Sequence, residues 1–398
     1  MRLALLIDDY LPDSTRVGAK MFHELACELV KYGHHVVVIT PGFNQKTSLE
    51  MSVLDGVTVW KFQSGPIKDI GKVKRAINET LLSIRGWNAI KAEVTPDYFD
   101  GIVYYSPSIF FSHLVTKLKK VCNCKSYLVL RDLFPQWAVD EGLMKQGSLI
   151  ERYFRYFEKL NYKAANNIGL MSQNNLTLFN SRTDNIYQTS ILRNWTSFAP
   201  FDSNVASFSY REKLNLNNKV IYFYGGNIGH AQDMANLIRL ARDMQVYPQA
   251  HFLFVGQGDE VELINQLAKD WQLDNFTYLP SITQLEFKHL LSEVDVGLFS
   301  LARNHTAHNF PGKLLGYMVE SLPILGSVNP GNDLQDIVNE YDSGNVFVNG
   351  ESGYLFKAAV RYLDNEYRVS KGSNSTRLLH SLFTVEGVAC SILMELNN

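Results

Sequence analysis

The chain has 398 residues, of which 46% are hydrophobic and 20% are charged, and its formal net charge is −2. A disordered chain would carry fewer apolar residues and a larger charge imbalance, so this composition indicates a folded globular protein, long enough for two domains. The near-neutral charge also disfavours a nucleic-acid partner, because many phosphate-neutralising cations would be needed to hold one.

The charges are unevenly distributed along the chain. Residues 1–200 contain 24 Lys and Arg against 18 Asp and Glu, whereas residues 201–398 contain 14 against 22. We therefore expect only the first half to meet an anionic surface or substrate.

The sequence gives few signs of targeting. The apolar run Leu3–Ile7 is followed at once by Asp8 and Asp9, so it is too short for a signal peptide and predicts a buried strand. No run of about 18 apolar residues could span a bilayer. Four cysteines in so long a chain do not make a disulfide framework, and we expect them to be reduced in a cytoplasmic protein.

In the first half, short apolar runs alternate with longer segments of helical periodicity. The predicted strands are Arg2–Ile7, His35–Thr40, Val57–Phe62, Gly101–Tyr105, Ser126–Arg131 and Ile168–Met171. The predicted helices are Gly18–Tyr32, Val73–Ile90, Phe110–Val121 and Leu149–Ala165. Such alternation is typical of a parallel sheet with helices on both faces.

The pattern restarts after a non-periodic segment, 197–209, which we predict to be a linker. The predicted strands of the second half are Val220–Tyr224, His251–Val255, Phe276–Leu279, Val294–Ser300, Ile324–Gly326 and Asn345–Val348. The predicted helices are Gln232–Met244, Glu260–Trp271, Gln284–Leu291, Gly312–Ser321, Asp333–Asn339 and Ser352–Leu363. The fold class is therefore α/β, with doubly wound Rossmann-like domains over 1–196 and 210–380. A helix over 381–398 follows, for which a return to the first domain is one option. Open sheets of this kind bind ligands at the carboxyl ends of their strands.

The loop after the first strand, Asp8–Ala19, lacks the Gly-x-Gly-x-x-Gly turn of a dinucleotide-binding domain, which argues against a nicotinamide dehydrogenase. Gly18, just before a predicted helix, suits a close backbone approach to a ligand. In the second half, the glycine-rich turn Gly225–Gln232 joins a strand to a helix, where main-chain N–H groups can face a diphosphate. Glycine-rich turns without any ligand are also common.

A second candidate anion site surrounds Lys313. The string His308–Lys313 precedes a predicted helix, and a cation on a first helical turn opposes the helix dipole. This placement favours an anionic ligand over a lysine that points into solvent. In the first half, Arg131 and Asp132 end a strand, where they form either a site pair or a structural ion pair.

The basic amphipathic segment Lys68–Trp87 has two interpretations, an anionic membrane surface or a solvated helix face. Motifs of other chemistries are missing from the sequence: it has no Asp-x-Asp triplet, no zinc spacing of His and Cys, and no Gly-x-Ser-x-Gly elbow. We therefore expect no metal and no cofactor.

Together these strings resemble glycosyltransferases of family four, which have the GT-B fold of two Rossmann-like domains facing across a cleft. The strings that carry the resemblance are Tyr10-Leu11-Pro12 with Gly18, Tyr32–Thr40, Gly225–Gly229, Phe254–Gly258, Asp295–Leu298 and Pro311–Met318 with Pro323. The strings Arg131–Trp137, Gly225–Met234 and Asn309–Tyr317 narrow the resemblance to bacterial L-fucosamine transferases of O-antigen and capsule synthesis.

The resemblance implies retaining transfer of a sugar from a UDP-sugar, such as UDP-N-acetyl-L-fucosamine. The acceptor would be an undecaprenyl-diphosphate-linked saccharide, reached by a peripheral protein on the cytoplasmic face of the inner membrane. Without a metal motif, the departing diphosphate would be stabilised by the main chain around Gly226–Gly229, the helix start at Gly312, and Lys313.

The other site residues are assigned with the resemblance. Arg131 and Asp132 are expected to orient a sugar, and His308 to contact the donor sugar. The donor-binding set is completed by positions in both halves: Gly18, Gly226, Asn227, Gly229, Gln232, Gly256, Pro280, Ser281, Phe310, Pro311 and Gly312.

One departure from the family pattern concerns ribose recognition. The family often carries a Glu-x7-Glu pair, and the matching positions here are His308 and Gly316, with Glu320 as a less favoured substitute. Two alternatives to a glycosyltransferase remain: a UDP-sugar 2-epimerase of the same fold and a non-catalytic nucleotide-sugar binding protein.

Overall fold

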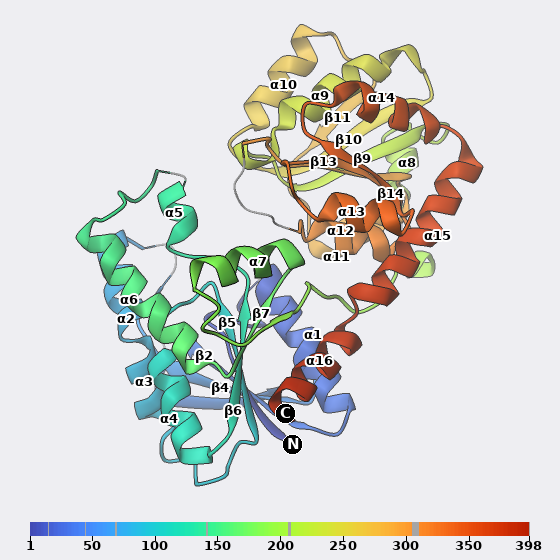
Figure 1. Ribbon diagram of the computed structural model, residues 1–398. Coiled ribbons are helices and arrows are strands. Elements are labelled where there is room, and N and C mark those ends of the chain that lie inside the picture. Colours follow the sequence, from blue (N-terminus) through green and yellow to red (C-terminus); the bar gives the residue numbers. More distant parts are fainter. Residues whose placement is uncertain are drawn as a thin grey trace. The chain divides into compact units, whose positions relative to one another are not determined.

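A computed structural model describes residues 1–14, 16–43, 45–67, 70–140, 142–205, 208–304 and 310–397. The chain divides into two compact units, which Figure 1 shows in sequence colours. The first unit comprises Met1–Thr196 with Val385–Asn398, and the second comprises Ser197–Thr384.

The first unit is built on an eight-stranded sheet in the order β3-β4-β2-β1-β5-β6-β7-β8. Its strands are β1 Arg2–Leu6, β2 His35–Gly42, β3 Leu49–Leu54, β4 Val57–Gln63, β5 Gly101–Ser106, β6 Lys125–Leu130, β7 Asn167–Leu170 and β8 Thr189–Ile191. All neighbouring strands of this sheet pair in parallel except β3, which pairs antiparallel with β4. The inner strands are buried on both faces, so each reads as a continuous apolar run.

Helices cover both faces of this sheet (Figure 1). They are α1 Val17–Lys31, α2 Lys72–Thr80, α3 Leu82–Ile90, α4 Ser112–Cys122, α5 Gln136–Asp140, α6 Leu149–Ala164, α7 Gln173–Arg182 and α16 Val385–Asn397. Apolar residues of α1 and α16 share one core, whereas those of α3, α4, α6 and α7 share the core on the other face. The last helix of the chain therefore completes the first unit.

The first half also contains departures from the predicted elements. The single helix predicted over Val73–Ile90 is two helices that meet at Leu81 and differ in burial: α3 buries Leu82 and Ile90, whereas Ile77 of α2 is exposed. Strand β3 was not predicted, because it lies at the sheet edge with mostly exposed side chains and has no apolar run. Strand β8 is only three residues long.

The second unit has a six-stranded, all-parallel sheet in the order β11-β10-β9-β12-β13-β14. Its strands are β9 Val220–Asn227, β10 Ala250–Gln257, β11 Phe276–Leu279, β12 Val296–Ser300, β13 Ile324–Val328 and β14 Gly344–Val348. All six strands predicted for this half are confirmed.

Helices again cover both faces (Figure 1). They are α8 Tyr210–Lys213, α9 Met234–Asp243, α10 Val261–Asp270, α11 Gln284–Ser292, α12 Lys313–Val319, α13 Leu334–Glu340, α14 Ser352–Arg361 and α15 Asn365–Leu382, with short 3₁₀ turns η1 Ser203–Val205, η2 His230–Gln232 and η3 Met244–Val246. Residues of the predicted linker pack on this unit: the Phe201 N–H donates to Glu320 at 2.8 Å, and the Phe201 ring stacks on His289.

Candidate functional site

The carboxyl ends of β9 and β10 expose main chain rather than side chains. Gly226 is paired with Gly256, and its φ of 116° belongs to a region that side chains disfavour. A Cβ on Gly256 would lie 1.8 Å from the Gly226 carbonyl oxygen. Both positions therefore require glycine. Together they form a strip of backbone at the sheet edge that is exposed at Gly226 and buried at Gly256.

Lys313, the first residue of α12, lies against this strip. Its Nζ is 3.3 Å from the centroid of the Tyr224 ring, and a Cβ on Gly226 would lie 3.8 Å from the same nitrogen. The structure thus brings together two residues, Lys313 and Gly226, that are 87 positions apart in the sequence and were assigned independently to an anion site.

The Lys313 ammonium group has an unusual environment. Burial holds its pKa well below the usual range, and within the described residues no carboxylate pairs with it. The face of Tyr224 gives only a cation–π contact. A cation that has lost water without gaining a counter-ion is a strong partner for an incoming anion.

Helix α12 itself contributes less than the sequence suggests. It begins at Lys313, one residue after the predicted start at Gly312, and it has seven residues, with Gly312 as a preceding residue that makes no side-chain cap. Pro311 and Phe310 lead into it, and Phe310 packs on Phe383 with ring centroids 4.5 Å apart. His308, the residue assigned to the donor sugar, lies outside the described residues.

The turn after β9 is held in shape by side chains that the sequence singled out. Asn227 Nδ2 donates to Gln232 Oε1 at 2.9 Å. A Cβ on Gly229 would lie 2.8 Å from Asp259 Oδ1, so this position accepts only glycine without movement of its neighbours. Below the turn, the hydroxyl of Tyr317 accepts from the Gly225 N–H and donates to the Leu298 carbonyl.

Sequence reasoning missed His230 and Glu260 at this edge. The exposed imidazole of His230 lies 2.8 Å from the carboxylate of Glu260, which is buried and also accepts the N–H of Met234 at 3.2 Å. Glu260 thus ties the turn after β9 to the turn after β10. The pair is 30 residues apart, so only the histidine inside a glycine-rich turn could have signalled it.

Pro280 and Ser281 follow β11, the strand beside β10, and both are exposed. Tyr278 donates to the Gly256 carbonyl at 3.0 Å, which links the ends of these two strands. The edge of the sheet therefore continues from Gly226 through Gly256 to Ser281, and a role of these residues towards base and ribose stays a prediction.

Gly316 on α12 and Glu320 just after it, the two described positions considered for ribose recognition, both make contacts within the second unit. A Cβ on Gly316 would lie 3.2 Å from a methyl carbon of Leu291, so this side of α12 packs on α11. Glu320 accepts the Phe201 N–H, and burial raises the pKa of its carboxyl group. This carboxylate fixes the segment entering the second unit, and the suggestion that Glu320 replaces the family glutamate stays untested.

In the first unit, Arg131 is a structural residue. Its Nη1 donates to the Leu192 carbonyl at 2.6 Å and its Nη2 to the Arg193 carbonyl at 3.0 Å, while the guanidinium lies over the Trp195 ring. Burial lowers the pKa of Arg131 to about 10. The guanidinium is therefore bound to main chain, and its predicted contact with a sugar finds no support in this geometry.

Asp132 belongs to a polar group at the carboxyl edge of the same sheet. Burial raises the pKa of Tyr105 to about 12; the charge of Arg131 lowers it in part, and the carboxylates of Asp132 and Asp8 raise it further. Gly18 allows this arrangement, because a Cβ there would lie 3.0 Å from the Tyr105 hydroxyl. Tyr105, at the end of β5, was not predicted as a site residue.

Three of the buried polar atoms that have no hydrogen-bond partner among the described residues lie at the same edge. They are the hydroxyl oxygens Thr40 Oγ1, Ser64 Oγ and Ser106 Oγ, at or near the ends of β2, β4 and β5. Buried polar atoms in folded proteins nearly always have partners. Their alignment along neighbouring strand ends marks this edge as suited to a ligand rich in hydroxyl groups.

The predicted membrane segment is only partly amphipathic. Lys68 and Asp69 lie outside the described residues. Ile77 and Ile84 are exposed, but Trp87 packs against the core. Within the described ranges, no helix is long and apolar enough to cross a bilayer, and no three His, Cys, Asp or Glu side chains lie close enough together to hold a metal ion.

Comparison with known proteins bears directly on the second unit. Residues 207–377 match the family described as "Glycosyl transferases group 1". Most of the second unit therefore matches the group 1 glycosyl transferase domain. The glycine strip and Lys313 therefore lie in the domain that this family model covers.

Two curated relatives match more of the chain than the group 1 domain, each at 23% identity. The "Putative colanic acid biosynthesis glycosyl transferase WcaI" of Escherichia coli is 23% identical over 91% of both chains. The "Probable glycosyltransferase WbjE" of Pseudomonas aeruginosa is also 23% identical, over 57% of both chains, so the match spans little more than half of its length.

The fold of the whole chain is that of GT-B glycosyltransferases. The Anabaena HepE protein, solved in complex with UDP and glucose, superposes on the chain with a TM-score of 0.67 at 14% identity, over 100% of this chain and 99% of that one. The predicted fold class is confirmed.

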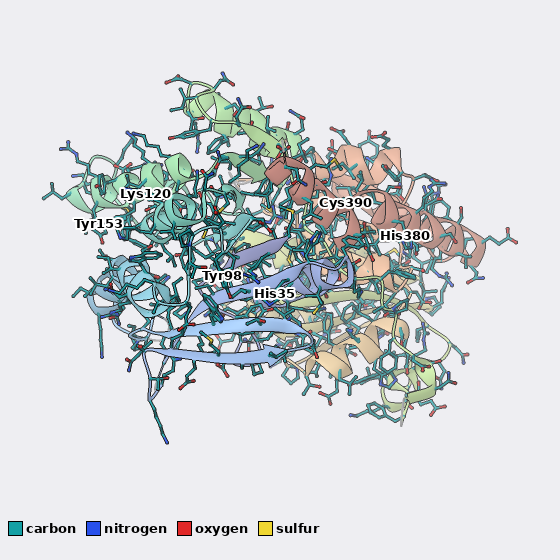
Figure 2. All side chains as sticks on the ribbon, turned by 90° about the horizontal axis from the view of Figure 1, so that it is seen from below. His35, Tyr98, Lys120, Tyr153, His380 and Cys390 are labelled. Carbon is teal, nitrogen blue, oxygen red and sulfur yellow. The ribbon has the colours of Figure 1, made fainter. Side chains whose placement is uncertain are left out.

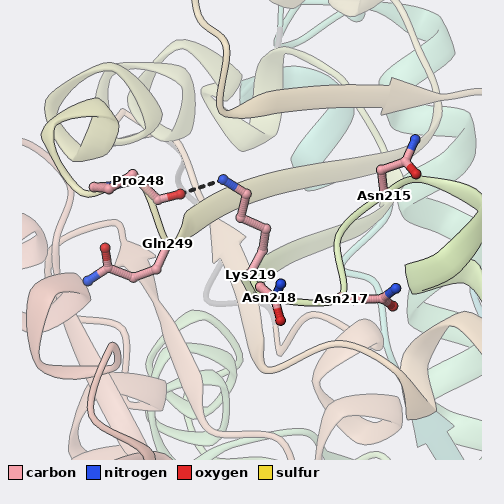
Figure 3. Close-up of a pocket in the computed structure, with 6 residues that line it drawn as sticks. All are labelled: Asn215, Asn217, Asn218, Lys219, Pro248 and Gln249. Atoms are coloured by element: carbon pink, nitrogen blue, oxygen red, sulfur yellow. Dashed lines mark hydrogen bonds between the residues drawn. The ribbon is translucent and has the colours of Figure 1, made fainter.

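A hollow of about 560 Å³ lies at the opposite, amino-terminal edge of the group 1 domain's sheet (Figure 3). Asn215, Asn217, Asn218, Pro248 and Gln249 line it with Lys219, whose Nζ donates to the Pro248 carbonyl at 2.5 Å. Strands β9 and β10 start here and end at the glycine strip, so this hollow is separate from the candidate site.

Proposed function

We propose that the protein is a retaining glycosyltransferase that moves a sugar from a UDP-sugar to a lipid-linked saccharide during surface polysaccharide synthesis. The observation that carries the proposal is the half-buried ammonium of Lys313, which pairs with no carboxylate of the described residues, beside the exposed backbone of Gly226 in the region that matches the group 1 family. The names of the relatives and the UDP in the HepE complex support the nucleotide sugar and the polysaccharide context.

The chemical demand at this edge is charge stabilisation. As the bond between the anomeric carbon and the diphosphate breaks, negative charge grows on the leaving group and the sugar becomes oxocarbenium-like. Fixed dipoles and one cation in a water-poor site can stabilise this charge without reorganisation. In the proposal, Lys313 and the main chain at Gly226 fill that role, and no metal ion is required.

The acceptor is assigned to the polar edge of the first unit. Asp132, Tyr105 and Asp8 lie there with buried hydroxyl groups that lack partners among the described residues. In the retaining step the acceptor oxygen bonds to the anomeric carbon on the face from which the diphosphate departs. The acceptor proton passes to an oxygen of the leaving phosphate, so no enzymic base is needed.

The finer assignments rest on the family resemblance and on charge. N-acetyl-L-fucosamine is the sugar that the resemblance implies, and an undecaprenyl diphosphate carrier is the implied lipid. The positive excess of residues 1–200 supports contact of the first half with the cytoplasmic face of the inner membrane.

The test is incubation with a panel of UDP-sugars and lipid-linked acceptors extracted from bacterial membranes, with products identified by mass spectrometry. Sugar transfer supports the proposal. Interconversion of the UDP-sugar alone would indicate the epimerase, and binding without turnover would indicate a nucleotide-sugar binding protein. Treatment with a chelator should leave transfer intact; loss of activity that Mg²⁺ or Mn²⁺ restores would refute the metal-independent route.

A further inference from the structure

A groove of about 800 Å³ lies between α6 and α7 of the first unit, and no step of the proposed reaction uses it. Its floor is aromatic. Tyr162 and Phe179 are buried edge to face with centroids 5.1 Å apart, and half-buried Tyr187 packs on Tyr162 at 5.7 Å. Tyr187 is the partly exposed ring of the three, so the α6–α7 groove offers its ring surface at the base, supported by the two buried rings.

Cations line one wall of the α6–α7 groove in a row. Arg155, Lys159 and Lys163 are spaced four residues apart on α6, so the row runs along one helix face for about 12 Å. Arg182 at the end of α7 stands on the opposite wall. The groove therefore carries positive charge along its length and not at a single point.

Most of these cations are available to a ligand. Lys159, Lys163 and Arg182 are exposed and form no ion pair with a carboxylate in the described ranges. Arg155 differs, because it is held by Glu151 and Glu158.

Two carboxylates also line the groove. Glu158 is buried and accepts hydrogen bonds from Arg155 and from the Tyr162 hydroxyl at 3.0 Å. Asp184 is exposed at the rim, with a φ of 52°. Four cations against two carboxylates leave a net positive groove.

We propose that the α6–α7 groove binds a linear acidic saccharide, as a subsite for the polymer on which the enzyme works. The inference rests on the proposed function for its saccharide context. A single phosphate or diphosphate is one compact charge and would meet only part of the cation row. A chain of acidic sugars matches both features, since its carboxylates repeat along its length and the C–H faces of its rings are apolar enough to cover tyrosine.

The probe is a hexamer of galacturonic acid, compared with neutral maltohexaose, by isothermal titration calorimetry on the full chain. The wild type should bind the acidic hexamer more tightly than the neutral one, and binding should weaken as salt rises. Combined substitution of Lys159→Gln, Lys163→Gln and Arg182→Gln should weaken acidic hexamer binding about tenfold, the sum expected for three exposed ion pairs.

A matched control removes the same number of charges from another face. Lys91→Gln, Lys117→Gln and Lys120→Gln change exposed lysines near α3 and α4, of which Lys120 is labelled in Figure 2, and should leave binding within twofold of the wild type. In the opposite direction, Asp184→Asn removes a repulsive carboxylate, keeps a residue that tolerates positive φ, and should tighten binding about twofold. Damage to the fold could not produce a gain.

The inference and the proposed function can fail separately. UDP binding is measured on the same samples and should be equal in the wild type and in all three variants. If the wild type binds UDP but not the acidic hexamer, or if both triple variants weaken hexamer binding equally, the inference is overturned and the donor assignment stands. Equal affinity for pyrophosphate or for a short DNA duplex would also overturn it, because neither is an acidic sugar chain.

Discussion

The carboxyl edges of the two sheets are built from different groups. The second unit presents exposed main chain at Gly226 with one cation, whereas the first presents the side chains of Asp8, Tyr105 and Asp132. Main-chain dipoles and an ammonium suit a diphosphate, which is common to many donors. Side-chain carboxyl and hydroxyl groups instead suit the hydroxyl pattern of one acceptor. The contrast suggests that the second unit supplies catalysis and the first supplies acceptor selection.

The largest effect should come from Lys313→Ala. Loss of the cation beside Gly226 should lower kcat for sugar transfer by about 10² to 10³, the cost of removing one preorganised donor. Steady-state rates at saturating donor test this. The matched control is Lys269→Ala, which removes an exposed lysine from α10 of the same unit and should leave kcat within twofold. A folded Lys313→Ala enzyme with wild-type kcat would contradict the assignment.

The requirement for bare backbone is tested by Gly256→Ala. The added methyl group would overlap the Gly226 carbonyl, so we expect the free energy of unfolding to fall by about 3 kcal/mol. Gly353→Ala, in α14, is the control, and it should change the free energy of unfolding in the opposite direction. A Cβ there meets nothing within 4 Å, and alanine should stabilise the helix by about 0.5 kcal/mol. Chemical denaturation of both variants measures the difference, and equal stability would refute the close approach.

Sequence reasoning was most successful where one local signal sufficed. The buried parallel strands of the second unit are continuous apolar runs that the sequence pattern identifies. Lys313 was also selected by one local signal, a cation at the start of a helix, and its role at an anion site stays a prediction. The role of Arg131 could not be predicted, because its two carbonyl partners are 61 and 62 residues further along the chain. The link from His230 to Glu260 is long-range in the same way. Edge strand β3 gave no apolar run to detect.

The neighbours Arg131 and Asp132 allow a matched test of the first unit. Arg131→Met leaves the Leu192 and Arg193 carbonyls without their donors, so we expect a loss of about 2 kcal/mol in the free energy of unfolding. Asp132→Asn should leave stability within about 0.5 kcal/mol but raise the acceptor KM about tenfold, as one charged hydrogen bond to the acceptor is lost. Denaturation and steady-state kinetics separate these effects. If Asp132→Asn changes the KM for the donor instead of the acceptor, the assignment of acceptor selection to the first unit is refuted.

The smallest effect should be the pH dependence of donor binding. Because burial depresses the pKa of Lys313, part of the population loses this cation as pH rises through the lowered pKa, and affinity for UDP should fall there. A bound diphosphate favours the charged form, so binding should take up protons on the alkaline side, which calorimetry in buffers of different ionisation enthalpy can measure. Lys313→Arg, whose guanidinium stays charged, should remove both the alkaline fall in affinity and the proton uptake. If proton uptake persists in that variant, a different titrating group is responsible, and the assignment of the uptake to Lys313 is refuted.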